Sequence, residues 1–562
     1  MNIRAKLTTL LQDAVTQAGI EYDGDIALEY PVELSRGDFA TPLAMKLGKQ
    51  LGQNPRELAE QITTHLGARL PSEVDRVEVA GSGYINFILS NTFFASLKQK
   101  IIDSKNEWGA NDKLATQTYL LEHSSPNLFK PFHIGHLVNN FVGASLERIV
   151  AISGAKTHTV SFPSDVSPGI AKAIWGLIDL SYTNQFTIEQ VGEAYTHGSQ
   201  AYKEDRDAKM RIDEINREIY ESQDTDAYRL YKEGRALSLE YFQSITTRLG
   251  SSFERLFFES ECEIVGKEIV RTYTGSVFVE SDGAIIFEGS KYGLFDNVFI
   301  NSQGFGTYLC KDTGLISKKF ATYNFDCSLT VTDIEQKQHF QLLKKAVEQI
   351  NPSWSEKSHF IHHGRLALSS GKISSRDGKV PLAEDLLYEV GNRVLEKMQG
   401  RDIDNPEQVA EKVAQSALKY AILRSATGKN IVFDFERDLS FEGTSGPYIQ
   451  YAFVRAKSAL LEAEELLTGS EPAIRTGKAP ELERQLLRFP DMVTRSLDDY
   501  SPHHIAHYAY ELASEFNSFY AQTKIADASN PDMRANIDLV KAVGQTLHNA
   551  LYLLGIDTVD EM

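Results

Sequence analysis

Two histidines, His133 and His136, flank Ile134 and Gly135 in a pattern suited to phosphate chemistry. Gly135 lets the backbone approach a nucleotide closely. Apolar residues at helical spacing follow, so both imidazoles lie at the start of a predicted helix, where ring and backbone N–H groups can meet phosphate oxygens. Four letters alone are a weak signal, because histidines that cap a helix or pack in a core give the same pattern.

The residues around this tetrapeptide supply its context. Before it come a strand-like run, TYLLEHSS, and a loop, SPNLFKP, which contains Asn127 and Lys130. The helix after it ends at Gly154, and KTHTVSF has the pattern of the next strand. The order strand, loop, helix, strand predicts a βαβ unit with the histidines at its first turn.

A second segment with chemical potential is Lys372-Ile373-Ser374-Ser375-Arg376. It is rich in serine and glycine and carries two cations, which could meet the charge that develops on a transferring phosphoryl group. Taken alone, it is equally typical of a surface loop. Its pairing with the histidine signature favours the catalytic interpretation.

The string EHSSPNLFKPFHIGHL resembles the arginyl-tRNA synthetases of class I, in which Ser-Ser-Pro-Asn and Lys-Pro precede the histidine signature. The segment at Lys372 then corresponds to the KMSKS signature, whose second lysine is missing here. Many arginyl enzymes also lack it and use the lysine just upstream of the histidines, which is Lys130. The resemblance implies catalytic roles for Lys130, His133, His136 and Lys372. The implied ATP contacts are Asn127, His133, Gly135, His136, Lys372, Ser374 and Ser375.

The amino-acid substrate implied by the resemblance is L-arginine, whose guanidinium is best met by carboxylate and carbonyl oxygens beside an aromatic ring. Tyr308 and Asp312 match a family Tyr-x-x-Arg-Asp motif, with Lys311 in place of the arginine. Gln336 matches a glutamine three residues before a histidine. The implied arginine-binding set is Glu122, Ser124, Asn127, His133, Tyr308, Asp312 and Gln336.

Both ends of the chain resemble tRNA-binding parts of the same family. GDFATPLAMKLGKQLGQNPRELAEQI and GSGYINF resemble the appended domain that touches the tRNA elbow, and the helix-patterned tail resembles the anticodon-binding bundle. The implied tRNA contacts are Asn86, Tyr448, Tyr451 and Met562, since aromatic side chains can stack on splayed bases. Core packing, or for Asn86 a role in the turn, is the alternative for each.

Length and pattern predict a multidomain α/β protein, because 562 residues exceed one ordinary core. We expect a small α/β domain at 1–112 and a Rossmann-type nucleotide-binding catalytic domain at 113–430, with an insertion at about 180–300. Beyond residue 430 almost every segment is helix-patterned. Residues 431–562 are therefore expected to form an all-α anticodon-binding bundle.

Composition limits the partners and the compartment. The formal net charge of −19 opposes indiscriminate binding to nucleic acid, so contact with tRNA must use local patches and shape. The three cysteines are widely spaced, which argues against disulfides and a structural zinc site and fits a reducing cytoplasm. We expect no membrane span, no protein-held metal, Mg²⁺ bound with ATP, and a monomer.

The resemblance implies ATP-dependent charging of arginine tRNA through an arginyl-adenylate, with first attack by the 2′-hydroxyl and with tRNA bound before the adenylate forms. The segment Ser164-Asp165-Val166-Ser167-Pro168-Gly169 departs from the family's Gly-Asp-Trp-Gly, and Asp377 follows Arg376 where a lysine is common. A synthetase for another amino acid and a small HxGH nucleotidyltransferase are disfavoured by the arginine set and by length. A non-catalytic tRNA-binding paralogue stays open as the strongest rival.

Overall fold

The computed structural model describes residues 3–31, 33, 36–67, 69–369, 381–463 and 472–562, and it divides into two compact units. Unit 1 comprises residues 1–108, 452–489 and 511–549, and unit 2 comprises residues 109–451, 490–510 and 550–562. Each unit is described separately below. None of the helices in the described ranges is long and apolar enough to cross a membrane.

Unit 2 is built on a five-stranded parallel sheet with the order β11-β10-β4-β5-β6. Its strands are β4 (Thr118–Glu122), β5 (Lys156–Ser161), β6 (Arg255–Leu256), β10 (Cys327–Asp333) and β11 (Ser358–His363). The order reverses between β4 and β10, and ligands of such sheets bind in the crevice beyond the carboxyl ends of the strands at this point.

Helix α5 (Ile134–Ile152) connects β4 to β5 and completes the predicted βαβ unit. Its buried face includes Leu137, Phe141 and Leu146, and the chain turns after it at Gly154, whose φ is +94°. Only glycine adopts such a φ without strain, which explains why the helix ends here. The sequence prediction of strand, loop, helix and strand is confirmed.

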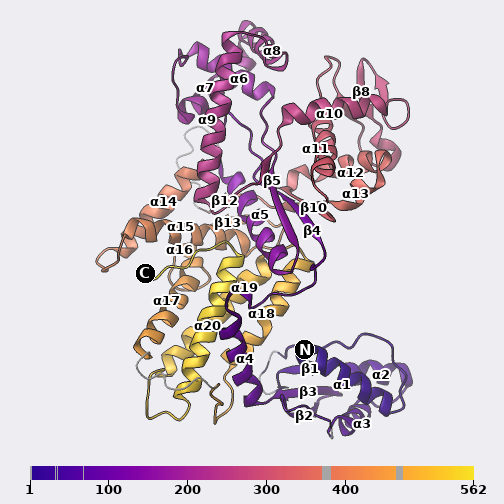
Figure 1. Ribbon diagram of the computed structural model, residues 1–562, viewed down its shortest axis with the longest axis vertical. Helices are drawn as coiled ribbons and strands as arrows, with labels where there is room; N and C mark the ends of the chain where they lie inside the picture. Colours follow the sequence, from indigo (N-terminus) through magenta and orange to yellow (C-terminus); the bar gives the residue numbers. More distant parts are fainter. Residues whose placement is uncertain (1–2, 32, 34–35, 68, 370–380, 464–471) are drawn as a thin grey trace. The chain divides into compact units, whose positions relative to one another are not determined.

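A helical group follows β5 and lies together in magenta in Figure 1. It consists of α6 (Pro168–Asp179), α7 (Ile188–Glu204), α8 (Arg206–Tyr220) and α9 (Asp226–Arg248). These helices enclose an apolar core that includes Ile174, Leu177 and Leu230, and this core also takes up Phe129 from the loop before the histidines. The helical group is therefore packed directly onto the loop that carries Lys130.

The stretch expected as an insertion, about 180–300, also contains part of the main sheet. Arg255–Leu256 form β6, which pairs with β5 through Val160 opposite Arg255. Two residues are too short to show a strand pattern in the sequence. Three further strands, β7 (Val279–Ser281), β8 (Ala284–Phe287) and β9 (Asn297–Ile300), form a separate antiparallel sheet.

Helices α10 (Glu259–Thr272) and α11 (Tyr308–Thr322) pack unusually closely through glycines on both. A Cβ on Gly314 of α11 would lie 1.9 Å from the Cys262 carbonyl oxygen of α10, and one on Gly266 would lie 2.0 Å from the Cys310 carbonyl oxygen. The backbones can approach this closely only because neither glycine has a side chain. This contact fixes α11, which carries Tyr308 and Asp312.

The rest of unit 2 packs mainly against α5, α11 and β11. It contains η4 (Ile334–Gln336), α12 (Lys337–Ile350), α13 (Pro352–Lys357), α14 (Ala383–Met398), α15 (Pro406–Leu423) and α16 (Phe435–Asp438). Strands β12 (Leu366–Leu368) and β13 (Ile431–Phe433) pair in parallel as a small second sheet.

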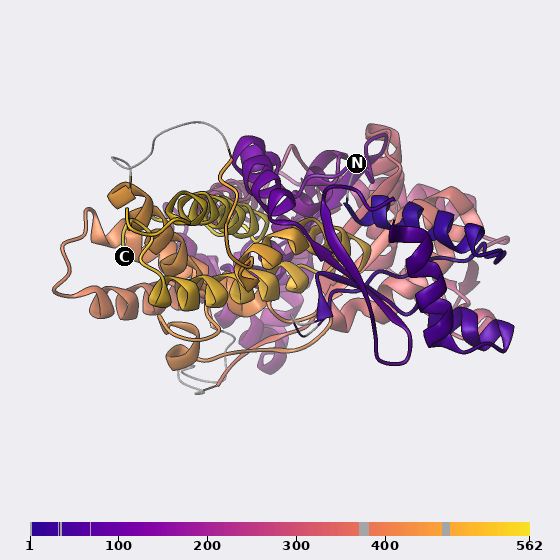
Figure 2. The same ribbon diagram turned by 90° about the horizontal axis from the view of Figure 1, so that it is seen from below.

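Unit 1 holds the predicted small α/β fold. Its antiparallel sheet has the order β1 (Phe39–Thr41), β3 (Tyr84–Leu89), β2 (Val74–Ala80), and α1 (Ile3–Gln17), α2 (Leu43–Leu51) and α3 (Pro55–Gly67) lie beside it in both views (Figures 1 and 2). The Asn54 side chain accepts a hydrogen bond from the Arg56 N–H at 3.0 Å, which stabilises the start of α3. The small α/β fold expected at the start of the chain is therefore present.

The tail is all-helical, as expected. Its helices are α17 (Gly446–Ala463), α18 (Glu481–Asp498), α19 (His503–Gln522) and α20 (Met533–Leu553). Within unit 1 they pack with α4 (Asn91–Ser104), where a buried ion pair joins Lys98 to Glu483 at 2.6 Å. Arg475 shares that carboxylate at 3.2 Å. A buried carboxylate with two cations ties α4 firmly to this bundle.

The close contact between α10 and α11 leads to a stability prediction. Gly314→Ala should destabilise unit 2 by about 1–3 kcal/mol, because a methyl group cannot fit against the Cys262 carbonyl. Gly391→Ala in α14 is the matched control, since nothing lies within 4 Å of the added Cβ. Alanine favours a helix interior over glycine, so this control should be neutral or stabilising. Calorimetric melting of both variants makes the comparison; equal melting temperatures would contradict the packing argument.

Candidate active site

The two histidines form a compact pair at the start of α5. His133 is the N-cap residue, and its Nδ1 accepts a hydrogen bond from the Gly135 N–H at 3.1 Å. The Nδ1 of His136 accepts from the His133 N–H at 3.2 Å, and the two rings stack with centroids 3.7 Å apart. Since both Nδ1 atoms accept, the ring proton of each neutral imidazole is on Nε2.

Burial keeps both rings uncharged near neutral pH. It lowers the pKa of His133 to about 4, and the nearby charge of Lys130 acts in the same direction. Burial also lowers the pKa of His136 well below its ordinary value, with further contributions from His133 and Lys130. The pair therefore offers neutral N–H donors to a ligand, while the positive charge comes from Lys130.

Residues 381–383, which follow the second signature in the chain, lie next to the histidine loop. The Ile134 N–H donates to the Pro381 carbonyl at 3.1 Å, and the Ala383 N–H donates to the Phe132 carbonyl at 2.8 Å. His133 and Leu382 form an antiparallel bridge. Lys372, Ser374 and Ser375 themselves lie outside the described residues. The segment that follows them is nonetheless attached to the histidine loop.

Ser124 occupies a strained position just after β4. Its φ is +56°, a left-handed conformation that serine rarely adopts. Its N–H donates to Asn139 Oδ1 at 2.6 Å, its hydroxyl accepts from Asn140 at 3.0 Å, and its carbonyl accepts from the Ser161 hydroxyl at 2.9 Å. These contacts hold the loop that leads to Asn127 and Lys130 in one conformation.

Asn139 ties this loop to the neighbouring strands. Its Nδ2 donates to the Val331 carbonyl of β10 at 2.7 Å and lies 3.3 Å from the His363 ring at the end of β11. Sequence reasoning missed Asn139. The available signal was its position within one turn of His136, which puts it at the same edge of the sheet.

Two carboxylates of the predicted arginine set already have partners, Glu122 being buried and Asp312 partly buried. Glu122, the last residue of β4, pairs with Lys319 of α11, and both side chains are almost fully enclosed. Asp312, also on α11, contacts His339 Nε2 of α12 at 2.5 Å. Asp312 and Lys319 are two turns apart on one face of α11, so both carboxylates belong to the same side of the sheet.

The other members of the set are more exposed. Tyr308 begins α11 one turn before Asp312 and is 56% exposed. Gln336 ends η4 and is also exposed. Asn127 is exposed on the loop, where it forms a parallel bridge with Ser164. Exposed polar groups around enclosed and partly enclosed carboxylates suit a site for a cationic side chain.

Lys311 is buried and has a structural role. Its ammonium donates to Glu259 at 2.7 Å and to the Val166 carbonyl at 2.9 Å. Burial alone lowers the pKa of Lys311, but the Glu259 carboxylate raises it above its ordinary value overall. Lys311 therefore stays charged and fixes segment 164–169 to α11.

Asp165, in the segment that departs from the family pattern, is fully buried and structural. It accepts hydrogen bonds from the Ser260 N–H at 2.9 Å and the Ser260 hydroxyl at 2.8 Å, and it pairs with Arg235 of α9 at 3.0 Å. The altered segment is thus an ordered junction between the sheet, α9 and α10.

The predicted tRNA contacts lie at separate places in the fold. In unit 1, Asn86 on β3 is buried and lines a hollow of about 480 Å³ with Glu29, Tyr30, Arg36 and Tyr84. The lining combines aromatic rings with Arg36 and two glutamates, and Arg36 is paired with Glu33 at 3.1 Å.

In unit 2, the other three candidates are half-buried. Tyr448 lies 5.8 Å from the ring of Tyr510, Tyr451 follows it by less than one turn on α17, and the Met562 carbonyl accepts from Arg401 at 3.0 Å.

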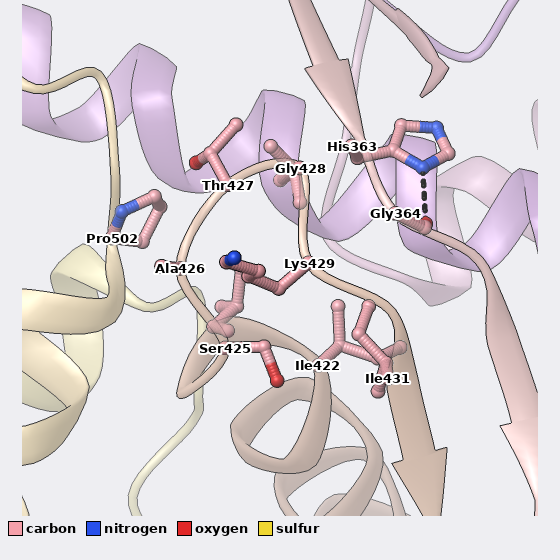
Figure 3. A pocket seen from close by; sticks show the side chains of 12 residues that line it. His363, Gly364, Ile422, Ser425, Ala426, Thr427, Gly428, Lys429, Ile431 and Pro502 are labelled. Atoms are coloured by element: carbon pink, nitrogen blue, oxygen red, sulfur yellow. Dashed lines mark hydrogen bonds between the residues drawn. The ribbon is translucent and has the colours of Figure 1, made fainter. Parts of the chain in front are cut away.

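A smaller cavity of about 10 Å³ lies behind the site, lined by Val142, His363 and loop 425–429. Figure 3 shows the loop curving around it, with His363 opposite and its Nδ1 bonded to the Gly364 carbonyl. It holds at most one water molecule, so it is a packing defect and no substrate pocket. Within the described ranges, no group of three or more His, Cys, Asp or Glu side chains could hold a metal ion.

Family models match three consecutive parts of the chain. Residues 5–89 match the arginyl tRNA synthetase N-terminal domain, residues 98–435 match the class I tRNA synthetase (R) catalytic domain, and residues 449–562 match the DALR anticodon binding domain.

Curated relatives match over the whole length. An arginine–tRNA ligase of Pediococcus pentosaceus is 29% identical over 569 aligned residues, covering 100% of both chains. One of Treponema pallidum is 31% identical and covers 96% of this chain and 95% of its own.

Solved structures share the fold. Arginyl-tRNA synthetase of Thermus thermophilus superposes with a TM-score of 0.80 at 22% identity, covering 100% of each chain. The Plasmodium falciparum enzyme gives a TM-score of 0.77 at 19% identity and covers 100% of this chain and 99% of its own. Because the arginyl catalytic-domain model spans more than half of the chain and the Treponema relative exceeds 30% identity, this chain belongs to the arginyl-tRNA synthetase family.

Proposed function

We propose that this site attaches L-arginine to arginine tRNA, using ATP and an arginyl-adenylate intermediate and releasing AMP and diphosphate. The observation that best supports the proposal is the juxtaposition at one sheet edge. His133 bridges to Leu382, which follows the second signature; Glu122 is the last residue of β4, and Asp312 contacts His339 on α12, the helix that follows β10 and η4. Nucleotide phosphates and a guanidinium can therefore be held side by side.

In the first step the arginine carboxylate attacks the α-phosphate of ATP in line, and diphosphate leaves. The nucleophile is already ionised, so no general base is needed. His133 and His136 donate from Nε2 to the nucleotide, since their Nδ1 atoms accept backbone N–H groups. Asn127, Gly135, Ser374 and Ser375 line the ATP site. Catalysis then consists of positioning and charge stabilisation.

Lys130 and Lys372 stabilise the negative charge that develops on the phosphates. Lys130 takes the role of the second signature lysine, whose position is occupied here by Ser375. Mg²⁺ binds with the nucleotide's phosphates and offsets their charge. Removal of the Lys130 ammonium should therefore raise the barrier to transfer without changing how arginine binds.

The arginine side chain is recognised by its charge and its shape. Asp312 accepts from the guanidinium, Tyr308 lies one turn before it on the same helix, and Gln336 contributes an amide. Glu122, Ser124, Asn127 and His133 hold the amino-acid end. Glu122 is paired with Lys319, which balances its charge. Its remaining lone pairs can accept hydrogen bonds from the ligand.

In the second step the 2′-hydroxyl of the terminal adenosine of tRNA attacks the adenylate, and tRNA binds before the adenylate forms. We assign residues 1–112 to the tRNA elbow, 113–430 to catalysis and 431–562 to the anticodon. Asn86 contacts the elbow, and Tyr448, Tyr451 and Met562 contact anticodon bases. We further propose that the protein is cytoplasmic, since all three cysteines are free and buried. We also propose that it is a monomer.

Charging of total tRNA with each labelled amino acid in turn tests the function. Arginine alone should become acid-precipitable with tRNA, and arginine-dependent exchange of diphosphate into ATP should require tRNA. Charging with a different amino acid would refute the specificity. Absence of charging with every amino acid would favour a tRNA-binding paralogue without catalysis.

Lys130→Ala tests the source of positive charge. Turnover in diphosphate exchange should fall about 100-fold or more, the usual cost of removing one preorganised charge donor, while the arginine KM stays nearly constant. Lys232→Ala on α9 is the matched control, because Lys232 also lies over a tyrosine ring, that of Tyr228 at 5.1 Å. Near-normal turnover in Lys130→Ala would remove this residue from the mechanism.

A further inference from the structure

The loop that carries Lys130 is anchored to α9 on its N-terminal side. Phe129 is fully buried and has a φ of +60°, and its N–H donates to the Ser238 hydroxyl at 3.1 Å. The Phe129 ring stacks on the Tyr231 ring, with centroids 6.2 Å apart. A Cβ added to Gly234 would lie 2.3 Å from the Phe129 ring. A left-handed phenylalanine persists only where its surroundings hold it, and here α9 does so.

On the C-terminal side the loop is held by α7 and α9 together. Pro131 packs against Gly192 of α7, where an added Cβ would lie 2.8 Å from the proline ring. The Phe132 N–H faces the Tyr241 hydroxyl of α9 at 3.4 Å, and that hydroxyl donates to Glu384 at 2.8 Å. Residues on both sides of Lys130 are thus fixed by the helical group that follows β5.

The Lys130 side chain itself meets one residue of that group. Tyr195 stands one turn after Gly192 on α7, and its ring centroid lies 5.6 Å from Lys130 Nζ. An ammonium over the face of an aromatic ring is attracted by the ring's quadrupole. A flexible lysine side chain thereby gains a preferred direction, and the uncharged ring does not neutralise its charge as a carboxylate would.

Segment 164–169 packs beside the Tyr195 ring through Gly169. A Cβ on Gly169, in the first turn of α6, would lie 3.4 Å from Tyr195 Cε2, so the ring is in contact with the glycine's side. Segment 164–169 is itself fixed by Asp165 and by the bond from Lys311 to the Val166 carbonyl. The segment that departs from the family pattern is therefore the support on which Tyr195 rests.

We infer that Tyr195 is a positioning residue for the reaction, holding the Lys130 ammonium toward the phosphates while leaving its charge intact. This inference rests on the proposed role of Lys130. The helical group 168–248 then contributes to catalysis, since α7 aligns the cation that compensates for the missing lysine of the second signature. Tyr195 acts through Lys130 and needs no contact with substrate.

The test is a double-mutant cycle on the full chain, measured as tRNA-dependent diphosphate exchange. Tyr195→Leu should lower turnover about fivefold to tenfold and leave the arginine KM within about twofold, as expected for a lost cation–π contact. Tyr195→Phe keeps the ring face and should retain turnover. In a Lys130→Ala background, Tyr195→Leu should have no further effect, because coupled residues are not additive.

Tyr202→Leu is the matched control. Tyr202 lies on the same helix and packs against the same core, and its own lysine partner, Lys172, lies 4.4 Å from its ring. This variant should keep normal turnover. Tyr195→Met provides a second non-aromatic replacement in case leucine impairs folding, and it should behave as Tyr195→Leu does.

Three results would overturn the inference: equal losses for Tyr195→Phe and Tyr195→Leu, an undiminished effect of Tyr195→Leu when Lys130 is absent, or normal turnover in both Tyr195→Leu and Tyr195→Met. If Lys130→Ala itself retains full turnover, the proposed role of Lys130 fails, and the inference about Tyr195 fails with it. If Lys130→Ala loses turnover and any of the three results is found, the role of Lys130 stands and only the inference about Tyr195 is overturned.

Discussion

The structure depends on keeping carboxylates charged inside a folded protein. A buried carboxylate without a partner costs several kcal/mol, so each acidic group of the site must be matched by a cation or a donor. Glu122 is matched by Lys319, Glu259 by Lys311, and Asp312 contacts His339. Two of the three partners, together with Asp312 itself, lie on α11. The placement of this one helix therefore decides whether the site can bind a cation.

The packing of α11 follows from this requirement. Gly314 and Gly266 bring α11 and α10 into backbone contact, and Lys311 reaches across to Glu259 at the start of α10. On the other side of the sheet edge, Ser124 and Phe129 hold left-handed conformations that tie the histidine loop to α5 and α9. The nucleotide side and the arginine side of the site are thus fixed by different helices that meet at the switch point of one sheet.

Much of this was predictable from sequence, and the remainder was hidden for physical reasons. The βαβ unit around His133, the helical tail and the family follow from motifs and periodicity, which are local. Strand β6 was missed because two residues carry no pattern. Lys319 and Tyr195 were missed because their partners, Glu122 and Lys130, are distant in the chain, and only the fold brings them together. Lys372 lies outside the described residues, so its role stays a prediction.

The central claim is that carboxylates select the guanidinium, and discrimination between arginine and citrulline tests it most directly. Citrulline has nearly the same shape but a neutral ureido group. Diphosphate exchange with tRNA present should favour arginine by at least about 100-fold in kcat/KM, because a site built to bond a charged donor rejects its neutral analogue. Asp312→Asn should lose most of this preference, whereas Asp282→Asn on an exposed turn should keep it. Comparable use of citrulline and arginine by the unmodified chain would contradict the account.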